Sequence, residues 1–380
     1  MANAWEQIKW IAAESLNHLE DVLVVTQLAA KDLTADFNER PNGYAIGSSV
    51  DIRTNPVYDA KEFGSAIEIQ EIRASARSLT IEKHFDVSVQ ITAKEKRLDM
   101  DRFSEQVIMP APYALAEKSD RYVAVKLAEA QGLYSSTDLF TSASDMALAK
   151  KAATFQQLST MGRFCIVNDE LEAALLGANY FTTYDNRGES GQRVFNDGAM
   201  GRAMGMDFYG SLSFPDISWT AGNGVGATKT APTGDQNKVG QTSLTLQAAA
   251  TGTFKNNDRI KIAGVRRPLI VKGDQATPSA IVLQHPITDL IPKTAAVTVI
   301  GSGRALDVKG AIFDAMSLVI ASPVLDMPSD KPSAVLSNNG FSIRVVQGYD
   351  INKKTETISL DLLIGAKAFD PRRITLLSDT

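Results

Sequence analysis

The sequence is poor in the residues that build most reactive sites. It holds one cysteine, Cys165, and three histidines, His18, His84 and His285. One cysteine excludes an intrachain disulfide and a thiolate-rich metal site, and it favours synthesis in a reducing compartment. The longest apolar runs fall short of the roughly 20 residues that span a bilayer, and no secretion signal is evident. We therefore expect no membrane partner.

Basic residues are fewer than acidic ones, with 39 lysines and arginines against 44 aspartates and glutamates. The formal net charge is −5 and the pI is near 5.4, which argues against a strong electrostatic grip on nucleic acid. Hydrophobic residues make up 44% and charged residues 22%, as in ordinary folded proteins. A chain of 380 residues can bury a large core and form two or three compact units.

Three motifs suggest chemistry at first sight and fail on inspection. Gly222–Thr230 (GNGVGATKT) resembles a phosphate-binding loop, but Thr228 stands where that loop needs glycine, and a proline-containing turn follows where it needs a helix. Cys165 lies between Phe164 and Ile166, where a small buried side chain is the ordinary interpretation. Asp99 and Asp101 lack a downstream calcium-loop glutamate. We predict no catalytic residue, cofactor site or metal site.

The N-terminal segment, residues 1–40, predicts an amphipathic helix. Its apolar residues recur at steps of three and four and form one stripe, which the proline of Arg40–Gly43 (RPNG) follows. Such a stripe packs either on its own domain or, as an arm, on a neighbouring subunit. The stripe consists of Trp5, Ile8, Ala12, Leu16, Leu19 and Leu23.

Residues 41–98 predict a long β-hairpin. Apolar side chains alternate with polar ones from Leu79 to Ile91, which indicates a strand with one apolar and one polar face. A hairpin of this length is expected to project, and its apolar face would need a partner to cover it. The face includes Phe85, Val87 and Val89.

Residues 99–213 predict an α/β core. Pro110 and Pro112 open a long helix that reaches Gly132 as a C-cap, and a second helix bears Met146, Ala149, Phe155 and Leu158 up to Gly162. A short buried strand (RFCIV) and a helix capped by Asn168 or Asp169 follow.

Residues 214–303 have a different composition and predict an inserted small β-barrel that folds autonomously. They are rich in glycine, threonine and short β-runs separated by turns. Residues 304–380 return to the core with two alternating strands joined by the turn GYDINKK. The β-runs are SLTLQA, RIKIAGV, PLIV, SAIVLQ and AVTVI.

The order of these segments resembles the major capsid (coat) proteins of tailed bacteriophages, whose fold is shared with herpesvirus capsids and bacterial encapsulins. Within that family, TGTFKNNDRIKIAGV and the position of the insert are similar to the coat proteins of short-tailed phages with an inserted β-barrel. Three further stretches carry the resemblance: RFCIVNDELEAALLG, GMDFYGSLSFP and AIFDAMSLVIASPVLDMP.

The resemblance implies an α+β capsid fold with an N-terminal arm, an extended loop, a spine helix and peripheral and axial domains. It implies a non-enzymatic protein of the virion that self-assembles in the host cytoplasm as hexamers and pentamers into an icosahedral shell. The expected partners are other copies of the chain, a separate scaffolding protein, a portal at one vertex, and packaged double-stranded DNA held by weak, non-specific contact. The expected contact residues are Trp5, Ile8, Leu16, Leu19, Phe85, Val87 and Val89.

A second interpretation stays open. A β-rich surface-binding or adhesin protein could use the inserted barrel to bind a ligand, and an enzyme ranks behind both. A shell protein should form large particles or capsomers, whereas an adhesin should bind its ligand as a monomer.

Overall fold

The computed structural model describes most of the chain, and all structural statements below concern the described part. The predicted break at Arg40–Gly43, the Asp99 and Asp101 pair and much of the predicted extended loop lie outside it. The described residues are 2–31, 49–53, 76–92, 110–156, 158–159, 161–182, 194, 200–229, 237, 239–329 and 331–380.

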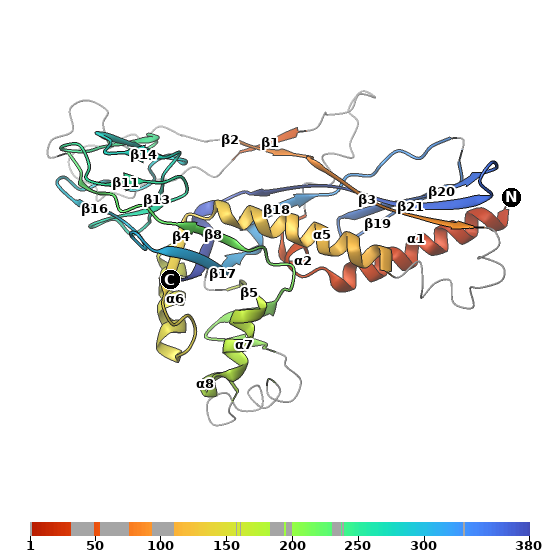
Figure 1. Ribbon diagram of the computed structural model, residues 1–380, viewed down its shortest axis with the longest axis horizontal. Helices are drawn as coiled ribbons and strands as arrows, with labels where there is room; N and C mark the ends of the chain where they lie inside the picture. The colour runs from red at the N-terminus through yellow and green to blue at the C-terminus, as the bar shows by residue number, and fades with distance from the viewer. Residues whose placement is uncertain are drawn as a thin grey trace, which may run out of the picture.

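One half of the molecule is a layer of helices on a long antiparallel sheet (Figure 1). The strand order is β18-β21-β20-β19, and β3 pairs with β21 along the edge opposite to β20. The helices α1, α2 and α5 lie on the apolar face of this sheet, and the short helix η3 continues α5. The elements are α1 (Ala2–Val22), α2 (Val25–Leu28), β3 (Lys83–Thr92), α5 (Pro110–Lys126), η3 (Leu127–Glu129), β18 (Leu318–Ala321), β19 (Ser333–Asn338), β20 (Phe341–Asp350) and β21 (Thr355–Ala368).

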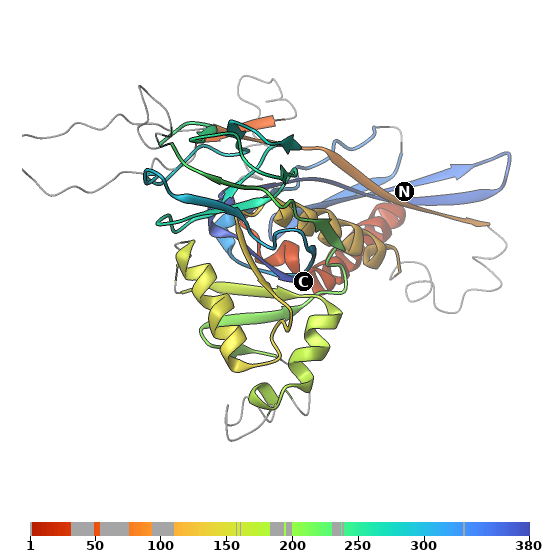
Figure 2. The ribbon, with the colours of Figure 1, turned by 60° about the vertical axis from the view of Figure 1, so that its left-hand side comes forward.

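A second, mixed sheet carries the α/β core. Its order is β4-β22-β17-β5-β7-β6, with β8 also paired to β17. Helices α6, α7 and α8 pack on one face, around Cys165, Phe208 and Ile312 (Figure 2). The elements are β4 (Gly132–Ser136), α6 (Ala143–Phe155), β5 (Arg163–Val167), α7 (Asp169–Gly177), α8 (Asn179–Thr182), β6 (Arg202–Ala203), β7 (Met206–Gly210), β8 (Ile217–Thr220), β17 (Ala305–Asp314), η4 (Ala315–Ser317), η5 (Pro371–Arg373) and β22 (Thr375–Asp379).

The caps of the core helices follow from local side-chain chemistry. The Asp145 N–H donates to Ser142 Oγ at the start of α6 (3.2 Å), and the Leu171 N–H donates to Asn168 Oδ1 at the start of α7 (2.9 Å). Each bond satisfies one of the backbone donors that a helix start leaves without a partner. Of the two caps predicted for α7, Asn168 is the one that caps it.

The insert contains all the predicted β-runs as strands, but these strands form open sheets and not a closed barrel. Four strands have the order β13-β12-β16-β9, and two further pairs are β10 with β15 and β11 with β14. The elements are β9 (Val225–Ala227), β10 (Ser243–Thr245), β11 (Thr253–Phe254), β12 (Arg259–Ile262), β13 (Leu269–Ile270), β14 (Gln275–Ala276), β15 (Ala280–Val282) and β16 (Ala296–Val299).

The two connections to the insert leave the core side by side. In strands β8 and β17, Thr220 and Ala305 are register partners. Just beyond them, the Ala221 N–H donates to the Arg304 carbonyl (2.9 Å) and the Gly303 N–H donates to the Gly222 carbonyl (3.1 Å). Strand β8, which the sequence boundary at residue 214 assigned to the insert, therefore pairs within the core sheet.

A buried arginine joins the insert to the end of the spine helix. Arg259 in β12 is fully buried, and its guanidinium donates to the carbonyls of Ala128 (2.8 Å) and Ala130 (2.7 and 3.2 Å). Its guanidinium carbon lies 4.9 Å from the centre of the Trp219 ring. The apolar side chains of the insert belong to the same buried cluster as those of α1, α5 and β21. Autonomous folding of the insert stays a prediction, but its core is continuous with the rest of the molecule.

Two predicted elements differ in the structure. The strand expected from Leu79 to Ile91 is divided: β2 (Ala76–Thr80) pairs with β1 (Ser49–Arg53), whereas β3 pairs with β21. The spine helix ends before Gly132, which starts β4 and is no C-cap. An added Cβ at Gly132 would lie 2.6 Å from Thr375 Oγ1, so this glycine allows β4 to approach the chain at the start of β22.

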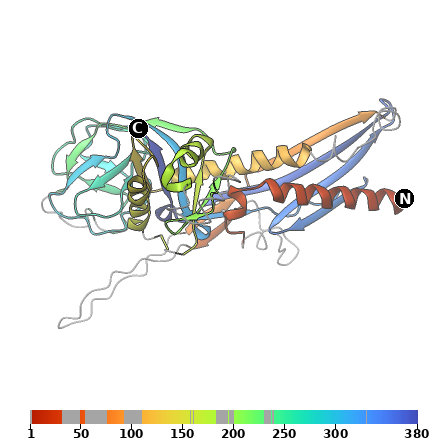
Figure 3. The same ribbon diagram turned by 90° about the horizontal axis from the view of Figure 1, so that it is seen from below.

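The molecule is elongated (Figure 3). The insert occupies one end, and the turn between β20 and β21 lies at the other, near the N-terminus of α1. The α/β core extends to one side between them.

Candidate assembly surfaces

The predicted stripe of the N-terminal helix packs on its own chain. Ile8, Leu16 and Leu19 are buried in the cluster formed with α5 and with strands β19 and β20. Trp5 lies within α1, but its side chain is outside the described set. Of the two alternatives for the stripe, the structure supports docking on the same domain. These three side chains are therefore buried within the subunit, and contact between the arm and another subunit stays a prediction.

A carboxylate on the spine helix fixes the arm in place. The buried Asp120 accepts hydrogen bonds from the backbone N–H groups of Val24 (2.7 Å), Val25 (3.2 Å) and Thr26 (2.9 Å), and from the Thr26 hydroxyl. Val24, the N-cap of α2, has no side chain that can cap the helix. Asp120 therefore supplies from α5 the acceptor that the start of α2 lacks.

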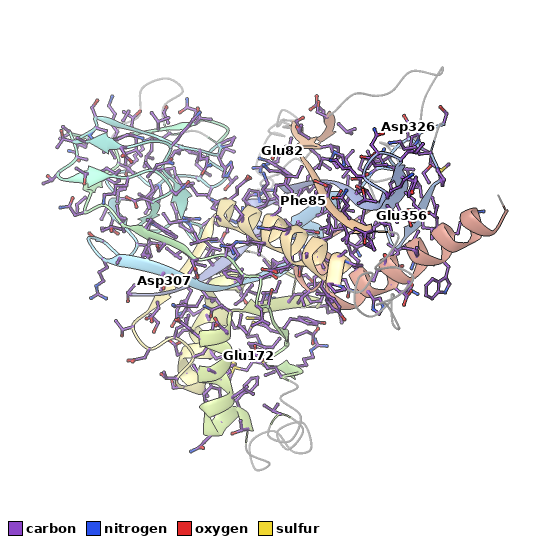
Figure 4. The ribbon with its side chains drawn as sticks, turned by 45° about the vertical axis from the view of Figure 1, so that its right-hand side comes forward. Glu82, Phe85, Glu172, Asp307, Asp326 and Glu356 are labelled. Atoms are coloured by element: carbon purple, nitrogen blue, oxygen red, sulfur yellow. The ribbon has the colours of Figure 1, made fainter. Side chains whose placement is uncertain are left out.

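The predicted apolar face of β3 also turns inward. Phe85 and Val87 are half-buried against the main cluster, and the Phe85 ring meets the Tyr122 ring of α5 edge to face at 6.2 Å. Val89 is half-buried on the same face and pairs with Ile358 of β21. Phe85 is labelled in Figure 4. The role of these three residues in contacts between subunits stays a prediction.

The opposite face of the long sheet carries polar side chains. Arg344 donates to Asp361 Oδ2 through Nε (2.9 Å) and Nη2 (2.6 Å), and His84 Nε2 lies 3.7 Å from Asp361 Oδ1. Ser88 donates to Ser359 across β3 and β21 (3.0 Å). Arg344 also donates to the carbonyl of Asp326, which anchors the connection between β18 and β19. Asp326 is labelled in Figure 4. Hydrogen-bonding groups of this kind suit a wet contact surface.

Large apolar side chains that the sequence analysis missed are exposed elsewhere. Trp10 in α1 is 57% exposed, Ile351 in the turn between β20 and β21 is 69% exposed, and Leu212 after β7 is 93% exposed. Trp10 could have been found from helical spacing, because it lies two residues from both Ile8 and Ala12 and so points off the buried stripe. Nothing in the local sequence marks Ile351 or Leu212, since burial in a loop depends on distant partners.

The described part of the chain shows no constellation for catalysis. Cys165 is completely buried, and burial raises the pKa of its thiol, so the reactive thiolate is suppressed. His285 lies in the insert with Nδ1 3.2 Å from Arg77 Nη2 of β2. Burial first, and then the nearby positive charge of Arg77, lowers the pKa of His285 to about 4. His285 is therefore neutral at physiological pH and accepts the arginine N–H.

Two other sequence candidates are placed by the structure. The stretch that resembled a phosphate-binding loop contains β9, which pairs with β16, and no helix starts there among the described residues. No group of three or more metal-ligating side chains gathers within the described ranges. Among those residues, no helix is both long and apolar enough to cross a membrane.

We compared the chain with protein-family profiles, curated proteins and solved structures, and only the solved structures gave a match. No protein-family profile matches the chain, and no curated protein matches it. Among solved structures, one from Mycobacterium phage Che8 aligns with a TM-score of 0.53 at 12% identity, over 93% of this chain and 90% of that chain. The chain has the fold of tailed-phage capsid proteins. The fold class expected from the sequence is confirmed in this respect, although the inserted barrel is replaced by open sheets.

Two further solved structures align at lower similarity. The capsid of cyanophage P-SCSP1u has a TM-score of 0.48 at 12% identity, over 88% of this chain and 84% of that chain. The mature capsid of bacteriophage PhiM1 has a TM-score of 0.45 at 12% identity, over 88% and 82%.

Proposed function

We propose that this chain is a major capsid protein that assembles into the icosahedral shell of a tailed phage, as hexamers and pentamers around double-stranded DNA. The observation that supports the proposal most is the extent of the fold likeness, which covers nearly the whole of both chains and not one module. On this proposal the protein is a structural component of the virion, assembled in the host cytoplasm, and not an enzyme.

The surface of the subunit supports the same proposal. The long sheet has one polar face, and in the described part β3 and β19 each pair on one side only. Exposed sheet edges and large exposed apolar side chains such as Trp10 and Ile351 are liabilities for a free monomer. Contacts between copies would cover them, and obligate interfaces commonly bury about 2,000 Å² or more.

The remaining partners follow from the same proposal. We propose weak, non-specific contact with packaged DNA, which the net charge of −5 supports because a strongly basic inner surface would hold the DNA. A separate scaffolding protein and a portal at one vertex are supported by the resemblance of the sequence alone. Without a scaffolding protein, we expect shells of mixed size.

Electron microscopy and sedimentation of the purified protein test the main proposal. We expect rings and closed shells, and the same preparation should show no saturable retention of double-stranded DNA at physiological salt. A protein that stays monomeric at high concentration, in the presence and absence of crowding agents, would refute the proposal. Glycan binding by that monomer would favour the adhesin.

A further inference from the structure

The β1–β2 ribbon is a separate two-stranded element of the described fold. In the described part of the chain, β1 and β2 pair only with each other, and the ribbon belongs to neither main sheet (Figure 1). Only Ile81 and Glu82 separate β2 from β3, which is part of the long sheet. A change in the position of the ribbon would therefore break no strand pairing of the main sheets.

The base of the ribbon is fixed to the long sheet and to the spine helix. Leu79 is completely buried in a small apolar cluster with two residues of β18. Glu82, which is labelled in Figure 4, accepts hydrogen bonds from Tyr122 Oη (3.1 Å) and Lys126 Nζ (3.3 Å) of α5. These contacts hold the end of β2 in place, so a moving ribbon would pivot about this end.

Arg77 connects the ribbon to the insert. Its Nη2 donates to His285 Nδ1 (3.2 Å), and its Nη1 donates to the carbonyl of Ala368 at the end of β21 (3.1 Å). Because a guanidinium has only donors, His285 Nδ1 is the acceptor and the proton of the neutral ring lies on Nε2. Nε2 is buried, and among the described residues no group accepts a hydrogen bond from it. The contact between ribbon and insert therefore requires the neutral imidazole.

The charges around His285 oppose a second proton on its ring. Positive groups face the ring from three elements, and one carboxylate acts against them. These groups are Arg77 of β2, Arg259 of β12, Lys367 of β21 and Asp370 just after β21. The Asp370 carboxylate is already engaged by Arg372 through two side-chain hydrogen bonds (2.7 and 2.8 Å). Burial first, and then these positive charges, keep the pKa of His285 near 4.

The other charged groups at this junction are arranged in pairs. Lys367 Nζ donates to Glu129 Oε1 of η3 (3.2 Å), and within the insert Arg267 Nη1 lies 4.0 Å from Asp289 Oδ1. Each of these carboxylates has a basic partner of its own. A protonated His285 would therefore add a positive charge to the junction without gaining a carboxylate partner.

We propose that the contact between Arg77 and His285 is an acid-sensitive latch: protonation of His285 releases the β1–β2 ribbon from the insert. The released ribbon pivots about its base at Leu79 and Glu82. A protonated ring would present an N–H at Nδ1 to the guanidinium N–H that it now accepts, and its buried Nε2–H would still lack an acceptor. Separation lets water solvate both cations. The latch is a property of the single subunit, so it does not depend on the proposed shell function.

The size of the effect follows from linkage between protonation and opening. In the open form His285 would regain its ordinary pKa of 6.5, in place of about 4 in the closed form. The ratio of open to closed subunits should therefore rise by about 25-fold between about pH 7.5 and about pH 5. The latch is closed at neutral pH and opens as the pH falls.

Spin labels on the two sides of the latch test the proposal in the full-length, unassembled subunit. Ser78→Cys and Gln284→Cys replace exposed residues next to the latch pair, and the native Cys165 is completely buried and adds little background. Electron paramagnetic resonance should give one short distance at the higher pH. At the lower pH a second, longer and broader population should appear and should disappear when the pH is raised again. A single short distance at both pH values, with an unchanged circular dichroism spectrum, would overturn the proposal.

Three substitutions in the labelled chain identify the group that responds to acid. His285→Gln keeps an acceptor for Arg77 but takes up no proton, so the short distance should persist at the lower pH. His84→Gln is the matched control, because His84 is 49% exposed beside Asp361, and it should leave the acid response unchanged. Arg77→Leu removes the latch and should show the longer population already at the higher pH. An acid response that survives His285→Gln, or a ribbon that stays closed in Arg77→Leu, would refute the latch.

Discussion

Removing the carboxylate of Asp120 should release the N-terminal helices from the spine helix. Asp120 is 2% exposed and accepts three backbone N–H bonds and one hydroxyl bond. Hydrogen bonds to a charged acceptor contribute roughly 1.5–3 kcal/mol each, and buried donors left without an acceptor cost about 1–3 kcal/mol. Because these effects are not additive, we expect Asp120→Ala to lower the free energy of unfolding by about 4 kcal/mol. Asp120→Asn keeps one oxygen and should cost about half as much.

The assay is urea denaturation of the unassembled subunit, with unfolding monitored by tryptophan fluorescence and circular dichroism. Glu117→Ala is the matched control, because Glu117 is an exposed acid one turn earlier on α5 and should change stability by less than about 0.5 kcal/mol. Thr26→Val removes only the hydroxyl donor and should cost about 1 kcal/mol. If Asp120→Ala were as stable as the control, α2 would not be docked on α5 in the free subunit, and our account of the arm would fail.

Three further predictions concern other buried groups. Arg259→Met should lower the free energy of unfolding by about 3 kcal/mol, since it leaves carbonyls at the end of the spine helix without donors, and a neutral result in urea denaturation would refute the anchoring role. The pKa of His285 is lower in the folded chain than in the unfolded chain, so the unfolded chain takes up the proton at a higher pH. The free energy of unfolding should therefore fall as the pH drops from about 6.5 toward 4. In thermal melts across this range, His285→Gln should reduce the dependence of stability on pH. Cys165 should resist a thiol reagent at pH 8 in the native subunit and react fully in urea, whereas fast native labelling would contradict its burial.

Local patterns in the sequence were enough to find most elements of the fold. The stripe from Trp5 to Leu23 predicts α1, a cap at Asn168 or Asp169 predicts α7, and the β-runs of the insert all became strands. These features depend on neighbours a few residues away, which the sequence displays directly. The fold class followed from their order.

What the sequence could not show depends on distant partners. Strand β3 pairs with β21, far along the chain, so local alternation gave its faces but not its neighbour. The apolar stripe of α1 looked equally suited to a neighbour and to its own domain, and only the position of β19, β20 and α5 decides between them. Phe155 was listed with Met146 and Ala149 of its helix, yet it is exposed whereas they are buried, because hydrophobicity alone does not tell which side of the helix meets the sheet.

Because Thr220 pairs with Ala305, the two ends of the insert lie side by side, and the core sheet does not restrict how long the insert is. Register partners in an antiparallel pair have Cα atoms about 5 Å apart, the same span that a two-residue turn closes. The core sheet would accept a short turn in place of residues 221–304, and loop-closure entropy changes only slowly with length. The present insert is held by the contact of Arg259 with the carbonyls of Ala128 and Ala130, by the bond from Gln131 Nε2 to the Pro268 carbonyl, and by the buried apolar cluster that it shares with α1, α5 and β21. Another domain could therefore replace the insert at this junction, provided that it supplies a donor for those two carbonyls and covers the apolar residues of the core that the insert now covers.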